Sequence, residues 1–152
     1  MTLTTIEPDT PTTDAAHDNH DDWFPAGCFA PDFVRDINRE LDRLAALEPN
    51  WDAEGAQRIK PAIIDAARRL AAELPPNRVR SPAVVPMAKG NLQFEWHEGP
   101  RSLELEFEDP QTIHYLKWHP EEGVEEEGSF PLQDTSRAVA LIRWFTRGVA
   151  YV

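Results

Sequence analysis

The sequence predicts a small α+β domain in which helices cover one face of an antiparallel sheet. Two observations support this fold class. Between residues 90 and 118, three short runs alternate apolar and polar residues, which is typical of strands that bury one face. Before and after this region, apolar residues recur every three or four positions, which is typical of amphipathic helices. The expected order is two N-terminal helices, a meander of three or four strands and a C-terminal helix.

Apolar stripes and proline positions place the three helices. The first helix is expected from about Pro31 to Leu47, because proline suits the first helical position and Pro49 disfavours a helical residue before it. The second is expected from about Pro61 to Leu74 and the last from about Thr135 to Arg147. Each presents one apolar face, so we expect all three to pack on the same face of the sheet.

The strands are expected at about 91–97, 101–107 and 112–118, with a short edge strand at 83–85. Their register follows from the apolar pattern, because a slip by one residue would bury carboxylates in place of apolar side chains. The acidic segment Glu121–Gly128 is predicted as a loop. The predicted pairs are Trp96 with Leu103, Phe94 with Leu105, Leu92 with Phe107, Phe107 with Ile113, and Leu105 with Tyr115.

Length, charge and cysteine content limit the function classes. A chain of 152 residues is the usual size of one domain, and we assign 25–152 to it. Residues 1–24 contain few large apolar residues and are predicted to form a disordered acidic tail. The net charge of −12 argues against direct nucleic-acid binding. The single Cys28, the lack of a signal-peptide pattern and the lack of a long apolar run predict a cytoplasmic protein without a membrane segment.

The predicted register places a set of acidic, histidine and apolar residues on the face opposite the core. Carboxylates that lie directly opposite each other on neighbouring strands repel, and a basic partner would relieve that repulsion. Two large apolar residues share this polar face, as is typical of an interface. The candidate partner-binding residues are Glu95, His97, Glu104, Glu106, His114, Leu116 and Trp118.

Negative charge is concentrated in the predicted sheet. Residues 90–130 contain eleven acidic residues and two basic ones, which gives this segment a net charge of −9. A segregated field of this kind steers a basic partner toward the sheet. The leading hypothesis is therefore a non-enzymatic protein–protein interaction module. It would act on a basic partner surface, either as a neutralising protein of the antitoxin or immunity type or as an accessory subunit.

Two other functions and one neutral interpretation compete with this hypothesis. Glu95, His97, Glu104 and His114 could bind a divalent metal and make the protein a metal-dependent hydrolase. The carboxylates could instead imitate phosphates, so that the protein inhibits a nucleic-acid-binding protein. The face could also be the ordinary solvent side of an antiparallel sheet. Because the sequence has no glycine-rich phosphate loop and no nucleophile paired with a base, we assign no catalytic residue and expect no metal and no cofactor.

Two motifs together resemble a group of short bacterial proteins of unknown function. One is the connector Asn-Trp-Asp-Ala-Glu-Gly-Ala over residues 50–56, and the other is the pair of strands beginning at Leu92 and Leu103. The resemblance covers about residues 35–145 and implies a bacterial stand-alone domain, with no activity to transfer. This chain has Ala53 where such proteins often have glycine, so the turn geometry could differ. We expect Trp51 to fill a gap in the core, the alternative being an anchor for a partner.

Overall fold

The computed structural model of the chain describes residues 30–74 and 80–147, with α3 ending at Arg147. The predicted tail 1–24 and Cys28 lie outside these residues. In the described part of the chain, three α-helices pack against one five-stranded antiparallel sheet, which confirms the predicted α+β fold class. None of these helices is long and apolar enough to cross a membrane.

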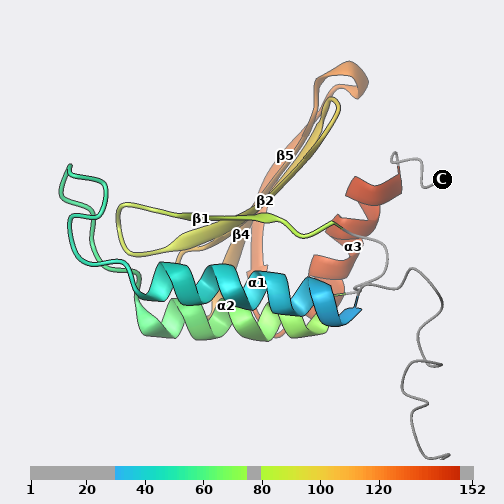
Figure 1. Ribbon diagram of the computed structural model, residues 1–152. Coiled ribbons are helices and arrows are strands. Elements are labelled where there is room, and N and C mark those ends of the chain that lie inside the picture. Colours follow the sequence, from blue (N-terminus) through green and yellow to red (C-terminus); the bar gives the residue numbers. More distant parts are fainter. Residues whose placement is uncertain (1–29, 75–79, 148–152) are drawn as a thin grey trace, which may run out of the picture.

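The three helices lie on one side of the twisted sheet (Figure 1). α1 (Ala30–Ala45) and α2 (Pro61–Glu73) run side by side in opposite directions, and α3 (Thr135–Arg147) packs against the third strand. The predicted bounds of α3 are confirmed, whereas α1 and α2 each end within two residues of the predicted end. Their apolar stripes are buried against the sheet, which is why amphipathic segments of this length become helices here.

The strands lie in the sheet in the same order as in the chain. They are β1 (Ala83–Pro86), β2 (Leu92–Glu98), β3 (Arg101–Phe107), β4 (Thr112–His119) and β5 (Val124–Pro131). The sheet has five strands instead of the three or four predicted. All five predicted strand pairs are confirmed: Trp96–Leu103, Phe94–Leu105, Leu92–Phe107, Phe107–Ile113 and Leu105–Tyr115.

We call the sheet face under the helices the inner face and the opposite one the outer face. The inner face forms the centre of the core, where Phe94 and Phe107 meet edge to face with ring centres 5.0 Å apart. Burial of such rings and of the aliphatic side chains around them is the main stabilising contribution to a domain of this size. Period-two alternation then leaves every second side chain of β2, β3 and β4 on the outer face.

The segment Glu121–Gly128 is not the loop that the sequence predicted. A short 3-10 helix, η3 (Pro120–Glu122), and Gly123 with φ of 69° reverse the chain, and β5 then pairs with β4 along its full length. Consecutive glutamates and a glycine have low strand propensity, which hides the strand in the sequence. Tertiary contacts decide the outcome, because Phe130 is buried opposite Ile113 and the Tyr115 ring lies where a side chain at Gly128 would be.

Candidate functional site

The outer face carries all seven candidate residues predicted from the sequence. The strand register orders them in three rows that cross β2, β3 and β4. β5 extends each row by one residue that was not predicted, because the segment was expected to be a loop. The rows are Gln93–Glu106–His114–Ser129, Glu95–Glu104–Leu116–Glu127 and His97–Ser102–Trp118–Glu125.

Two depressions hollow the outer face, one of about 530 Å³ and one of about 350 Å³. Glu104 and Leu116 line both, so the depressions adjoin at the middle row. The larger one lies toward the His114 end of the face, and the smaller one lies beside the turn at Gly99 and Trp118. The sheet therefore presents a shallow concave surface and not an enclosed pocket.

Glu104 is the most electrostatically strained group of this surface. Partial burial, followed by the nearby Glu95 and Glu106 carboxylates, raises its pKa, while His97 has the opposite effect. Glu95 and Glu104 are direct cross-strand partners, an arrangement in which like charges destabilise a sheet. No lysine or arginine of the described residues forms an ion pair or hydrogen bond with Glu104.

Apolar side chains lie within this acidic surface. The Trp118 side chain is 43% exposed and is the one large hydrophobic residue so exposed in the described part of the chain. It lies between Ser102 on β3 and Glu125 on β5. Leu116, its neighbour in the adjacent row, is half-buried. The face thus combines unpaired carboxylates with an exposed indole ring, which together suit a ligand with both cationic and apolar groups.

The two histidines of the outer face pair with different carboxylates and do not meet. His97 Nε2 lies 3.5 Å from Glu95 Oε2, and His114 Nε2 lies 2.6 Å from Glu108 Oε2. Within residues 30–74 and 80–147, no group of three or more His, Cys, Asp or Glu side chains is arranged to hold a metal ion. Of the four residues of the metal hypothesis, Glu95 and Glu104 face each other in the middle row and His97 pairs with Glu95, whereas His114 lies in another row and pairs with Glu108.

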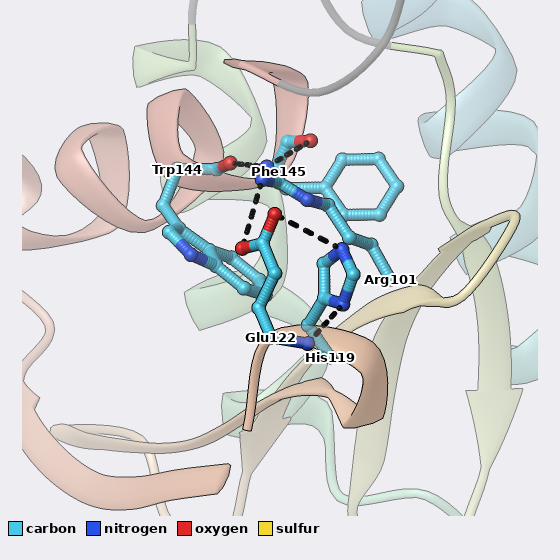
Figure 2. A network of polar contacts seen from close by, with 5 residues as sticks. All are labelled: Arg101, His119, Glu122, Trp144 and Phe145. Atoms are coloured by element: carbon cyan, nitrogen blue, oxygen red, sulfur yellow. Dashed lines mark hydrogen bonds and ion pairs between the residues drawn. The ribbon is translucent and has the colours of Figure 1, made fainter. Parts of the chain in front are cut away.

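A second polar cluster lies at the inner face, where β3 and η3 meet the end of α3 (Figure 2). The Arg101 guanidinium donates to the main-chain oxygens of Trp144 and Phe145 and pairs with the Glu122 carboxylate at 3.6 Å. Nδ1 of the buried His119 accepts from the Glu122 main-chain nitrogen. His119 and Glu122 are close in the sequence, but no sequence signal marked this cluster, because Arg101 meets Glu122 and the end of α3 only in the folded chain.

The connector over residues 50–56 is a compact turn. Asp52 Oδ1 accepts from the main-chain nitrogens of Glu54 and Ala56, and these bonds lower the pKa of Asp52. The Trp51 indole nitrogen donates to the Gln57 main-chain oxygen, and the ring is half-buried outside the main core cluster. The prediction that Trp51 fills the core was therefore wrong, because the turn itself holds the ring at the surface.

Comparison of the chain with protein-family models, with curated proteins and with solved structures gives no match. The resemblance to a bacterial group therefore stays a prediction.

Proposed function

We propose that this protein is a non-enzymatic interaction module whose outer sheet face binds a basic surface of a protein partner. The observation that carries the proposal is Glu104: it lies opposite Glu95, without a basic partner among the described residues, in a concave surface that also exposes Trp118. A solvent face needs neither stacked carboxylates nor an exposed indole ring.

The energetics favour a partner with lysine or arginine side chains. Like charges held opposite each other cost the free protein stability, and a cation placed between them removes that cost on binding. Leu116 in the middle row and Trp118 in the row beside it then supply apolar area within the contact, and buried apolar and aromatic side chains usually carry much of the binding energy. The carboxylates would chiefly speed association and select the partner, while the apolar pair would slow dissociation.

This arrangement suits a neutralising protein that covers a functional basic surface, or an accessory subunit that docks on one. The single cysteine of the chain fits a reducing bacterial cytoplasm as the place where this happens. In either role the partner would be a protein, and its own function would be blocked or positioned by the bound sheet.

The test is affinity capture from the native host with three forms of the full chain, followed by identification of the captured proteins. The first form is unaltered, and the second carries Glu104→Lys and Glu106→Lys. The third carries Asp65→Lys and Glu73→Lys, which change the net charge equally at exposed positions of α2. We expect a basic protein to be captured by the first and third forms and lost from the second.

A fourth form, Trp118→Ser, tests the apolar contribution without a change in charge. We expect it to retain the same partner at about tenfold weaker affinity, as for a large aromatic side chain that is buried on binding. Capture that is unaffected by the Glu104 and Glu106 reversals would remove the basis of the proposal. Displacement of the captured protein by DNA would instead indicate mimicry of a nucleic acid.

A further inference from the structure

The two edges of the sheet differ in how open they are to another strand. β1 has four residues, follows Pro82 directly and ends at Pro86, so it is short and its ends lack main-chain donors. β5 has eight residues, its only proline is Pro131 at its end, and it is the other edge of the sheet. Residues 125–127 and Ser129 of β5 are exposed.

The far side of β5 carries main-chain groups without partners in the described part of the chain. Between residues 124 and 129, the hydrogen bonds of the main chain are those of the β4–β5 pairing, and no other described group bonds to it. An edge of this length and exposure is a template for an added strand. β5 is therefore a second feature of this region, independent of its charge, that fits a ligand.

A second copy of the chain is a poor occupant of this edge. Residues 125, 126 and 127 are all glutamates, so pairing β5 with β5 of another copy would place carboxylates against carboxylates on both faces of the extended sheet. The glutamates thus protect the edge from self-association in the way that charged edge residues protect other sheets. A basic strand, by contrast, gains from the same charges.

We propose that an extended basic segment of the protein partner adds to β5 as a sixth strand. This inference rests on the proposed function and specifies how the basic partner engages the sheet. Main-chain hydrogen bonds along β5 would supply affinity, and the alternating side chains of the added strand would supply specificity.

The environment of the three glutamates predicts the pattern of that segment. Glu126 faces inward, and its negative charge is already compensated within the chain. The Tyr115 hydroxyl donates a hydrogen bond of 2.8 Å to the Glu126 carboxylate and lowers its pKa. The side-chain nitrogens of Lys117 and Arg137 each lie 3.6 Å from this carboxylate. Glu125 and Glu127 face outward, and no described basic side chain pairs with them. Basic residues are therefore needed at alternate positions only, with uncharged residues between them.

The experiment measures binding of capped synthetic peptides to the full chain. The first peptide is Thr-Lys-Val-Lys-Val-Lys-Thr, and a peptide of the same composition, Thr-Lys-Lys-Lys-Val-Val-Thr, breaks the alternation. Two further peptides carry N-methyl groups on one or the other alternate set of main-chain nitrogens, which block hydrogen bonding without a change in charge.

We expect the alternating peptide to bind about tenfold more tightly than the rearranged one. One N-methylated peptide should lose binding and the other should retain it, because only one set of nitrogens faces β5 in an added strand. The main-chain amides of residues 124–129 that point away from β4 should gain protection from hydrogen exchange, whereas those already bonded to β4 should change little. Glu127→Lys should weaken the binding, whereas the matched Asp65→Lys on α2 should leave it unchanged.

Absence of peptide binding, or binding that ignores both alternation and N-methylation, would overturn strand addition. So would wild-type chains that associate through β5 in sedimentation experiments. Such results would not contradict the proposed function. A partner that is lost on reversal of Glu104 and Glu106 but is still captured by Glu127→Lys would bind the outer face without adding a strand. If every one of these variants still captured the partner, both the proposed function and strand addition would be overturned.

Discussion

Arg101 contacts Trp144 in two ways at once: its guanidinium donates to the main-chain oxygen of Trp144, and its central carbon lies 5.0 Å from the centre of the indole ring. The residue therefore caps the end of α3, where carbonyl groups have no partner within the helix, and stacks on the helix surface. Its side chain is 11% exposed, so these bonds form largely away from water. One side chain of β3 thus fixes the position of the last helix.

Replacement of Arg101 is expected to be costly. Arg101→Met keeps most of the apolar stem but leaves the Trp144 carbonyl unsatisfied, and it should lower the free energy of unfolding by about 2 kcal/mol. Arg101→Lys should rescue little of the loss, since an ammonium group lacks the planar fork. Urea unfolding measures both. Arg80→Met is the control: Arg80 pairs with Glu98 at the surface, and its loss should cost less than about 0.5 kcal/mol. Equal effects of the two methionine variants would contradict this role for Arg101.

Ala53 is held in a conformation that suits glycine. Its φ is 66°, a left-handed value that costs an alanine about 1 kcal/mol, and it is stabilised by the turn that surrounds it. Ala53→Gly should raise the free energy of unfolding by about 0.5 kcal/mol, after the greater freedom of glycine in the unfolded chain is subtracted. The same change at the exposed helical Ala72 should lower stability by up to about 1 kcal/mol. Urea unfolding should therefore show a gain in stability at position 53 and a loss at position 72. A loss of stability at both positions would show that the turn does not strain Ala53.

The raised pKa of Glu104 makes stability depend on pH with a defined sign. Because the pKa is higher in the folded chain than in the unfolded one, the contribution of this group to stability is fully present below the unfolded pKa and is lost as the pH rises through the folded value. Glu104→Gln removes this loss. The variant should be more stable than the natural chain by about 0.5 kcal/mol at pH 7, and the difference should shrink toward pH 4.

Salt provides the control for this effect. At about 1 M NaCl, screening should reduce the difference between Glu104→Gln and the natural chain at pH 7, while a change in packing would persist. Thermal unfolding at both pH values and both salt concentrations separates the two causes. A difference that is constant with pH would mean that the pKa of Glu104 is not raised in the folded chain.

Local pattern was sufficient to predict most of the architecture. Helices and strands with one buried face repeat every 3.6 or 2 residues, so the bounds of α3 and the pairing of β2, β3 and β4 could be inferred from apolar positions alone. The same alternation placed Glu104 and Trp118 together on one face. Where propensity and tertiary structure disagree, as in β5 with its three glutamates, the sequence predicted the wrong structure.

The sequence by itself determined the fold class, the register of the central strands and the identity of the outward-facing residues. Each of these follows from the periodic spacing of apolar residues along a helix or strand. Only the tertiary structure decided that the outer face is concave, that β5 extends it as an edge strand with no further strand paired to it among the described residues, and that Arg101 holds α3. These features depend on contacts between segments far apart in the chain. Such contacts do not produce a periodic pattern in the sequence, because each occurs once and the spacing of the residues involved depends on the lengths of the loops between them.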